Sequence, residues 1–389
     1  MSDISIPNFR FKKYTNNLVK AKLSKIATFN PKSSLPENFK YIDLESVLGT
    51  ELVSYREETR ESAPSRAQRV AQKGDVFYQM VRPYQKNNYL FDLNENNYVF
   101  STGYAQLRPK VDSSFLLARL QEEGFVNKVI ERCTGTSYPA INSKDLSRIS
   151  ITIPEDLEEQ SAIGSLFRTL DDLLVSYKDN LANYQSLKAT MLAKMFPKAG
   201  QTVPEIRLDG FEGDWETKIL SEVTNITMGQ SPKSENYTDN PNDYILVQGN
   251  ADIKDKQVIP RLWTTEVTKM AEIGDIILTV RAPVGDIGKT DYNVVIGRGV
   301  AAIKGNDFIF YTLEKMKMTG FWNRFSTGST FESISSNDIK EAIIQIPTLK
   351  EQQAIGAYFL NLDNLINSYQ EKISQLEKLK KKLLQDMFI

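Results

Sequence analysis

An internal duplication constrains the fold of this chain more than any other feature of its sequence. Residues 351–388 repeat residues 159–196 at a constant offset of 192 without gaps, and the two segments are identical at 16 of 38 positions. Each segment follows an Ile-Pro pair, Ile153-Pro154 or Ile346-Pro347. A repeat of this length indicates duplicated domains rather than a solenoid of short repeats. The sequence therefore predicts two tandem units of about 195 residues each.

Weaker matches extend the duplication upstream of these tails. Pro7–Arg10 corresponds to Pro204–Arg207, and residues 134–146 correspond to residues 327–339. Gly74-Asp75-Val76 matches Gly274-Asp275-Ile276, and each leads through a β-rich run to an arginine, Arg82 or Arg281. The offset drifts between 192 and 203 along the chain. Each unit thus has a diverged body followed by a well-matched tail.

The tails carry the heptad pattern of a coiled coil. One apolar row holds residues 163, 170, 177, 184 and 191, with Leu166, Leu173 and Leu187 following in a second row. The second tail repeats both rows, but Asn180 and Lys372 interrupt the second row at equivalent positions. Equivalent residues meet only near a two-fold axis, so we expect an antiparallel helix pair with Tyr177 and Asn180 near Tyr369 and Lys372. The alternative is two separate amphipathic helices, each covering its own body.

The expected helix-pair and partner-docking residues share equivalent positions in the two tails: Gly164, Leu170, Tyr177, Asn180, Gly356, Leu362, Tyr369 and Lys372. The two glycines lie inside the predicted helices, where glycine is less favourable than alanine by about 0.5–1 kcal/mol. Their repetition suggests a close approach of the helix to the body or to a partner. Glycines tolerated near a helix start are the alternative.

The sequence predicts that the bodies have an α+β fold, because short β-rich runs separated by turn residues dominate them. One amphipathic helix is expected in each body, near Phe115–Glu123 and near Phe308–Met318. The expected plan, in chain order, is an N-terminal segment (1–18), a first body (19–153), a long helix (154–197), a linker (198–214), a second body (215–346) and a second long helix (347–389).

Composition excludes several kinds of chemistry. The chain has no histidine and a single cysteine, Cys133. It therefore lacks the residues for a Ser-His-Asp triad, for a disulfide and for cysteine or histidine zinc sites. No catalytic or metal-ligating set is apparent among the carboxylates. No segment approaches 18 consecutive apolar residues, and we expect a soluble cytoplasmic protein without a membrane segment.

One motif suggests a nucleotide site that its context does not support. Residues 297–302 fit the pattern GxGxxA, which binds dinucleotides when it joins a strand to a helix. Here the residues that follow read as another strand. The first body has Ser101-Thr102-Gly103 in this place. The sequence predicts a turn between strands rather than a phosphate site.

Residues suited to reading DNA occur on loops of both bodies, since base edges are read by Arg, Lys, Asn and Gln. The candidates in the first body are Ser65, Arg66, Gln68, Arg69, Arg82, Tyr84, Gln85 and Lys86. Those in the second body are Gln230, Ser231, Lys233, Gln248, Asn250, Arg281 and Arg298. Residues 20–150 hold 19 basic and 15 acidic residues, whereas residues 215–343 hold 14 and 17, so the second body alone should bind DNA poorly. Solvated loops are the alternative for any one segment.

Taken together, these features resemble the specificity (S) subunits of type I restriction–modification systems. The resemblance rests on the two bodies, the IPxxxEEQxAIG and IPxxxEQQAIG starts of the tails, the Leu-Asp pairs at 170–171 and 362–363, and the TG turns at 134 and 327. It implies two similar α/β target-recognition domains separated by two long helices packed as an antiparallel coiled coil, with pseudo-two-fold symmetry.

The resemblance also implies a function. Each body would read half of a bipartite site in double-stranded DNA, and the helices would set the spacing. The helices would also dock two methyltransferase (M) subunits, which carry S-adenosylmethionine; restriction (R) subunits, which use ATP and Mg, would join them. The chain itself would hold no cofactor and would not be an enzyme. The alternatives are a coiled-coil adaptor with two recognition heads that do not bind DNA, and a module with its own catalysis, which the missing motifs disfavour.

Overall fold

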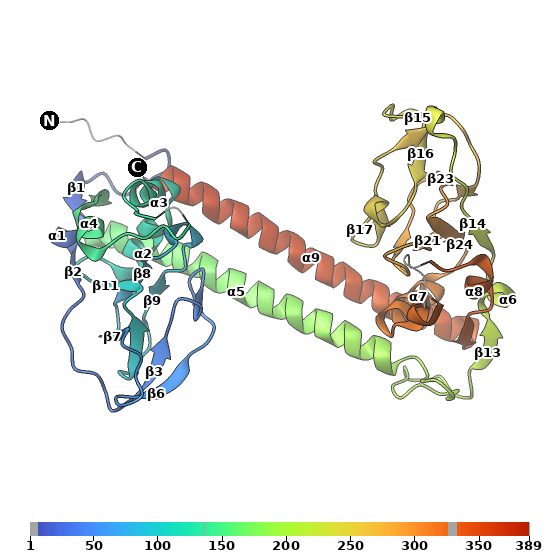
Figure 1. The fold of residues 1–389 in the computed structure, drawn as a ribbon, viewed down its shortest axis with the longest axis horizontal. Coiled ribbons are helices and arrows are strands. Elements are labelled where there is room, and N and C mark those ends of the chain that lie inside the picture. The colour runs from blue at the N-terminus through green and yellow to red at the C-terminus, as the bar shows by residue number, and fades with distance from the viewer. Residues whose placement is uncertain (1–6, 136, 326–332, 389) are drawn as a thin grey trace. The chain divides into compact units, whose positions relative to one another are not determined.

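The computed structural model describes residues 7–135, 137–325 and 333–388, and it divides into two compact units (Figure 1). Unit 1 comprises the chain up to Asp179 together with the chain from Gln370, and unit 2 comprises Asn180–Tyr369. Two long helices, α5 (Leu157–Lys194) and α9 (Leu349–Met387), each contribute to both units. A unit therefore contains one body and a segment of each long helix, rather than a body alone.

Body 1 has two four-stranded sheets in the orders β2-β11-β8-β9 and β6-β3-β10-β7, plus the pairs β1-β12 and β4-β5. Its elements are β1 (Leu18–Lys22), α1 (Leu23–Ile26), β2 (Ala27–Phe29), β3 (Asn38–Ile42), β4 (Val47–Leu48), β5 (Glu51–Leu52), β6 (Arg56–Thr59), β7 (Ala67–Val70), β8 (Val76–Gln79), η1 (Pro83–Gln85), β9 (Tyr89–Leu90), β10 (Tyr98–Ser101), β11 (Tyr104–Pro109), α2 (Ser113–Gln121), α3 (Glu123–Ile130), α4 (Ser143–Arg148) and β12 (Ser150–Pro154).

Body 2 repeats this framework with longer sheets, in the orders β14-β24-β21-β22-β18-β17 and β15-β19-β16-β23-β20, plus the pair β13-β25. Its elements are β13 (Glu216–Ile219), α6 (Leu220–Val223), β14 (Ile226–Met228), η2 (Ser234–Asn236), β15 (Tyr237–Thr238), β16 (Tyr244–Val247), η3 (Asn250–Asp252), β17 (Ile253–Lys254), β18 (Gln257–Val258), β19 (Trp263–Thr264), β20 (Met270–Ala271), β21 (Ile276–Thr279), β22 (Ile287–Lys289), β23 (Val294–Ile296), β24 (Val300–Ile303), α7 (Asp307–Met318), η4 (Phe321–Phe325), α8 (Ser336–Lys340) and β25 (Ile343–Ile346). The expected α+β bodies, each with an amphipathic helix, are confirmed.

The two helix segments run antiparallel within each unit, as expected. In unit 1, Asp171 of α5 pairs with Lys380 of α9, and Lys178 pairs with Glu377 at 3.3 Å. In unit 2, Lys188 pairs with Asp363 at 2.6 Å. Residue numbers thus rise along α5 as they fall along α9. The alternative of two helices that each cover only their own body is wrong.

The second buried row of the helix pair lies one residue further along than the sequence predicted. Phe167, Leu174 and Lys188 are buried, whereas Leu173 and Leu187 are 39% and 36% exposed. The same shift occurs in α9, where Phe359 and Ile366 are buried and Leu379 is exposed.

The polar interruptions of this row are therefore Lys188 and Lys380, and the prediction of Asn180 and Lys372 as interruptions is wrong. Lys372 lies on the surface, with its Nζ 5.8 Å from the ring centroid of Tyr177. In unit 2, the rings of Tyr369 and Tyr184 lie 5.5 Å apart. The heptad pattern alone could not choose between the two rows, because both contain leucines.

Each helix packs on its body through the predicted glycine. A Cβ on Gly164 would lie 2.6 Å from the backbone nitrogen of Phe115 at the start of α2, and a Cβ on Gly356 would lie 2.7 Å from the Cβ of Asp307 in α7. A real side chain does not fit at either distance. The close approach is made to the body, so glycines that are merely tolerated do not explain the repeat. Leu170 and Leu362 are buried in the cores of their units.

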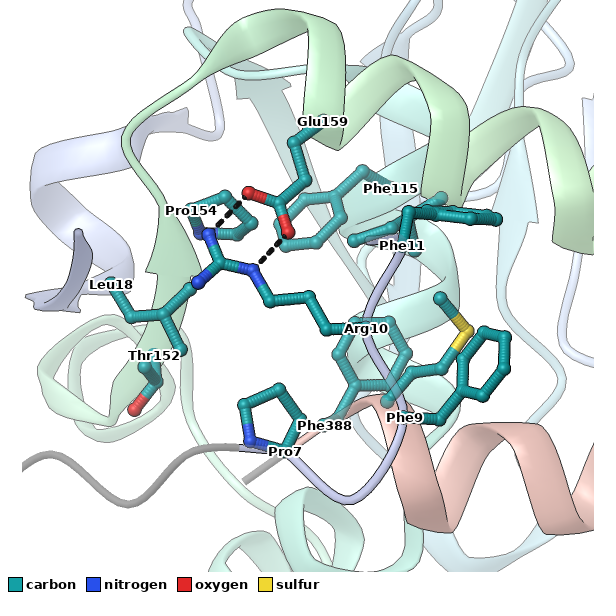
Figure 2. Close-up of a pocket in the computed structure, with 12 residues that line it drawn as sticks. Pro7, Phe9, Arg10, Phe11, Leu18, Phe115, Thr152, Pro154, Glu159 and Phe388 are labelled. Atoms are coloured by element: carbon teal, nitrogen blue, oxygen red, sulfur yellow. Dashed lines mark hydrogen bonds and ion pairs between the residues drawn. The ribbon is translucent and has the colours of Figure 1, made fainter. Parts of the chain in front are cut away.

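An arginine clamp ties the segment that precedes each body to a long helix. Figure 2 shows Arg10 directed at the carboxylate of Glu159, with nitrogen–oxygen distances of 2.6 and 2.7 Å. Arg207 makes the same two-pronged contact with Glu351, at 2.8 Å for both bonds. Both carboxylates are 1% exposed. These are the arginines of the matched segments Pro7–Arg10 and Pro204–Arg207, so the upstream duplication has a structural role.

Candidate nucleic-acid interface

Several of the predicted DNA-reading residues lie beside a junction of two turns that each body contains. In body 1, the backbone nitrogen of Met80, just after β8, donates to the carbonyl oxygen of Gly103 in the β10–β11 turn at 2.9 Å. In body 2, Val280 donates in the same way to Gly299 in the β23–β24 turn, also at 2.9 Å. The two bodies therefore present loops on an equivalent framework.

Ser65 and Arg66 lie in the loop before β7 and Gln68 lies at the start of β7, and all three are exposed. Thr102 of the β10–β11 turn donates its backbone N–H to the carbonyl oxygen of Arg66 at 2.8 Å. The Nε2 of Gln68 donates to the carbonyl oxygen of Ser65 at 2.7 Å, which shapes the loop internally. The bond between Thr102 and Arg66 places this loop beside the β10–β11 turn, which in turn contacts Met80 at the end of β8.

Arg69 differs from the other candidates because its guanidinium is partly buried. It lies on β7 opposite Phe100 of β10, and its Nε has no hydrogen-bond partner among the described residues. Burial lowers the pKa of Arg69. A buried donor without a partner destabilises the free protein, so an incoming acceptor such as a base edge or phosphate oxygen would be favourable here.

The second loop of body 1 follows β8. Arg82 has a left-handed backbone (φ 53°), and its guanidinium lies 4.7 Å from the ring centroid of Tyr138. Tyr84 is exposed. Two candidates are already engaged within the body: the Oε1 of Gln85 accepts from Gln79 at 2.8 Å, and Lys86 pairs with Glu123 at 2.6 Å. Arg82 and Tyr84 are therefore the side chains of this loop best placed to contact a ligand.

Four candidates of body 2 come together around the β23–β24 turn. Arg298 donates its backbone N–H to the Oγ of Ser231 at 3.1 Å, and Gln230 donates to the carbonyl oxygen of Ile296 at 2.8 Å. The carbonyl oxygen of Val247, just before Gln248, accepts from Gly297 at 2.8 Å. Gln230 and Arg298 are exposed at this junction.

Two glycines make the junction possible, and one of them belongs to the nucleotide-like motif. A Cβ on Gly229 would overlap the carbonyl oxygen of Gly297, and a Cβ on Gly299 would overlap that of Gln248. The residues after the motif form β24, as expected from the sequence. The glycines thus serve a close crossing of three backbone segments rather than a phosphate.

The remaining candidates of body 2 lie around this junction with their own contacts. Arg281 is exposed, and its backbone bridges to Ser333. The Nδ2 of Asn250 donates to Asp286, and the Nζ of Lys233 lies 3.8 Å from Glu235 on the surface. No group of three or more Cys, Asp or Glu residues in the described ranges could hold a metal ion, and no described helix is long and apolar enough to cross a membrane.

Hydrogen bonding corrects the match between Arg82 and Arg281. Ile141 donates to the carbonyl oxygen of Met80, and Ile334 donates to that of Val280, both at 3.0 Å. Met80 and Val280 are therefore equivalent, and Arg82 lies one residue beyond the position of Arg281. The predicted TG turn at 327 and part of the one at 134 lie outside the described residues, which omit residues 136 and 326–332.

Sequence reasoning did not identify Lys188, Lys380 or the hairpin-tip residue Lys256 as structurally important. A signal existed for the first two, because Lys188 and Lys380 are identical at the offset of 192, as are Asp171 and Asp363. No comparable signal marked Lys256, because the first body does not repeat this lysine.

Comparisons with known proteins agree with this architecture. The family model for the type I restriction modification DNA specificity domain matches residues 52–183 and 212–378. The putative type I restriction enzyme MjaX specificity subunit of Methanocaldococcus jannaschii is 29% identical over 281 residues, covering 69% of this chain and 65% of that protein. The MjaVIII specificity subunit of the same organism is 23% identical over 336 residues, covering 81% and 73%. This chain thus spans slightly less than two thirds of the MjaX relative.

Two solved structures have a similar fold along almost the whole chain. One is a chain from a study of complex assembly and conformational transition of the type I R-M system, with a TM-score of 0.57, 27% identity, and coverage of 96% of this chain and 98% of that one. The other is the type I restriction-modification S subunit from M. genitalium, with a TM-score of 0.66, 16% identity, and coverage of 99% of both chains. The second likeness supports the fold alone.

Proposed function

The chain belongs to the family of type I restriction modification DNA specificity domains, and from this premise we propose that it selects the DNA sequence on which a type I complex acts. Each body reads one half of a bipartite site in double-stranded DNA. The family membership favours this role over that of an adaptor whose two heads bind only proteins. A protein that acts on DNA in this way would work in the cytoplasm.

One observation carries the proposal. The two bodies share the same strands and the same junction of two turns, but they differ in the side chains of the loops around that junction. Body 1 offers Arg66, Arg69 and Arg82 there, whereas body 2 offers Gln230, Gln248 and Arg298. Forked donors of this kind discriminate bases in the major groove. An equivalent framework with different readers is what two different half-sites require.

The long helices are proposed to hold the half-sites at a fixed spacing. Each has 38 or 39 residues, which corresponds to about 57 Å at 1.5 Å per residue. Because each body packs on one long helix through a glycine contact and an arginine clamp, and meets Phe388 or Phe196 at the end of the other, its loops keep a fixed place on the helix pair. Two half-sites read by such bodies would be separated by a constant number of base pairs.

The helices also offer the same exposed apolar residues twice, which suits two copies of one partner. Leu157 and Leu349 are 61% and 62% exposed at equivalent positions, and Leu187 and Leu379 are a second such pair. We assign these faces to two methyltransferase subunits, which would bring S-adenosylmethionine and the methylation chemistry. Restriction subunits with ATP and Mg would complete the complex, and the present chain would supply no catalytic residue.

The proposal is tested by co-expressing the chain with its methyltransferase subunit and mapping methylated adenines. Arg82→Ala is expected to relax the first half-site alone and Arg281→Ala the second alone, by about fivefold to a hundredfold, because a bidentate arginine–guanine contact contributes about 1–3 kcal/mol of discrimination. Lys110→Ala is the matched control, since Lys110 is an exposed cation at the far end of β11. Equal loss at both halves, or methylation at the same sites without this chain, would contradict the proposal.

A further inference from the structure

A charged cluster in unit 2 joins body 2 to both long helices, and the proposed DNA contacts make no use of it. Lys188 of α5 lies 2.9 Å from Glu314 of α7 and 2.6 Å from Asp363 of α9. Lys256, between β17 and β18, lies 2.5 Å from Glu314 and 3.2 Å from Asp363. The hydroxyl of Tyr311 donates to Asp363 at 2.9 Å. Two lysines and two carboxylates thus share a largely buried site and balance in charge.

Lys256 is the one member of this cluster that comes from the β-sheet side of body 2. Its backbone carbonyl oxygen accepts from the N–H of Lys289 in β22 at 2.9 Å, and its neighbour Gln257 pairs with Lys289 in the sheet. On the same strand, a Cβ on Gly288 would lie 2.8 Å from Ile253 of β17. The tip of the β17–β18 hairpin is therefore hydrogen-bonded to β22. The same sheet contains β24, which follows the turn that carries the candidate DNA-contacting residue Arg298.

Unit 1 has the same helix chemistry without this connection. The pair Asp171–Lys380 is equivalent to Asp363–Lys188, but the tip of the corresponding hairpin, β4–β5, carries Thr50 in place of Lys256. The β4–β5 hairpin belongs to neither larger sheet of body 1. A cleft of about 570 Å³ opens there, lined by Thr50, Asp171 and Lys380 among others. The hairpin tip carries a lysine in unit 2 and a threonine in unit 1.

We infer that Lys256 is a positioning residue, which locks the sheet of body 2 onto the helix pair and so fixes where the second half-site is read. The inference rests on the proposed function for its DNA consequence, but the lock itself is a property of unit 2. The lysine bridges two carboxylates on two different helices while its own backbone is held by β22. Because Glu314 belongs to α7 of body 2 itself, the contact of Lys256 with Asp363 of α9 is the bond that breaks if the sheet tilts on the helix pair.

The test uses Lys256→Met in the complex with methyltransferase subunits, on a DNA library in which the gap between the half-sites varies base pair by base pair. The half-site sequences should stay unchanged, while methylation at gaps one base pair longer or shorter rises at least tenfold relative to the optimal gap. Lys254→Met is the matched control, since Lys254 is exposed on the same hairpin. Lys256→Arg should restore the single gap, because arginine can also reach two carboxylates.

Amide hydrogen exchange of the chain alone gives a readout that does not depend on DNA. In Lys256→Met, the amides of residues 253–258 and of Lys289 should exchange at least tenfold faster, while those of β23 and β24 keep the wild-type rate. If Lys256→Met prevents unit 2 from folding, Glu314→Gln removes one arm of the bridge more gently and should show the same two effects, weaker in size.

Unchanged gap selectivity in a folded Lys256→Met complex would overturn the inference, as would unchanged exchange of the hairpin. Faster exchange together with a relaxed gap supports it. If the wild-type complex recognises no bipartite sequence, the proposed function fails, and the exchange data then decide on the lock by themselves.

Discussion

The two units contain the same lysine–aspartate pair in very different surroundings. In unit 1, Asp171 and Lys380 have side chains that are 21% and 20% exposed, at the edge of an open cleft. In unit 2, the equivalent Lys188 is 7% exposed and has Glu314 as a second partner. The pair belongs to the duplicated helices, whereas everything that differs around it comes from the bodies. The duplicated helices have thus kept the lysine–aspartate contact. The bodies have diverged, and they differ in how many contacts they add between the body and the long helices.

Other contacts between the body and the long helices are alike in the two units. The arginine clamps and the helix glycines occur in both, and Phe388 packs on Phe115 as Phe196 packs on Phe308. The units are therefore expected to respond equally where the fastening is shared and differently where the bodies add to it. The unfolding of each unit can be followed by its own probe. The three tryptophans at 215, 263 and 322 all lie in unit 2, and the single cysteine, Cys133, lies in unit 1.

The largest expected effect is loss of an arginine clamp, and it should be equal in the two units. Arg10→Ala leaves the carboxylate of Glu159 buried without its cation, and Arg207→Ala does the same to Glu351. Removing one partner of a buried ion pair reduces the free energy of unfolding by about 3 kcal/mol. Urea unfolding followed by thiol reactivity of Cys133 measures the first, and tryptophan fluorescence measures the second. Lys12→Ala is the exposed control; a difference of several-fold between the clamps would break the equivalence of the units.

The lysine pair should give an unequal result. Lys188→Met leaves Glu314 and Asp363 with one lysine between them at a buried site, at a loss of about 2–3 kcal/mol in the free energy of unfolding of unit 2. Lys380→Met removes a pair that water can reach, so unit 1 should lose about 1 kcal/mol or less. The same two unfolding probes measure both variants. Equal losses would mean that the surrounding body adds nothing to the shared pair.

The sequence predicted the duplication, the α+β bodies, the antiparallel helices and the glycine contacts, because each leaves a repeated or periodic signal. It misplaced the second buried row by one residue, since Leu173 and Leu187 fit a heptad as well as Phe167 and Leu174 do. Only the body decides which row is covered. Burial of a lysine such as Lys188 is likewise invisible in a sequence, because its carboxylate partners lie 126 and 175 residues away.

The candidate readers show a similar division. The GD-to-arginine runs mark the strands β8 and β21, as the sequence predicted, and the candidate loops follow these strands. It did not reveal that Lys86 and Gln85 are engaged inside body 1, or that Arg82 and Arg281 differ in register by one residue. Those facts depend on contacts between segments far apart in the chain, which no local pattern encodes.

The smallest expected effect comes from transplanting the unit 2 arrangement into unit 1. Phe115 and Phe308 are equivalent through their aromatic contacts, so Gln121 occupies the place of Glu314, just as Thr50 occupies that of Lys256. Thr50→Lys combined with Gln121→Glu would build a second lysine–carboxylate bridge at the cleft. Because the cleft is open to water, the gain in the free energy of unfolding of unit 1 should be only about 0.5–1 kcal/mol.

The more informative measurement on this double variant is hydrogen exchange of the β4–β5 hairpin, whose amides at Gly49 and Glu51 should be protected several-fold more than in the wild type. Thr50→Lys alone is the matched control, since it adds a cation without the carboxylate that would receive it. Protection in the double variant but not in the control would show that the charges are sufficient to hold a hairpin on the helix pair. No added protection would show that the pairing of β18 with β22, which β4–β5 lacks, is the part of unit 2 that makes its lysine effective.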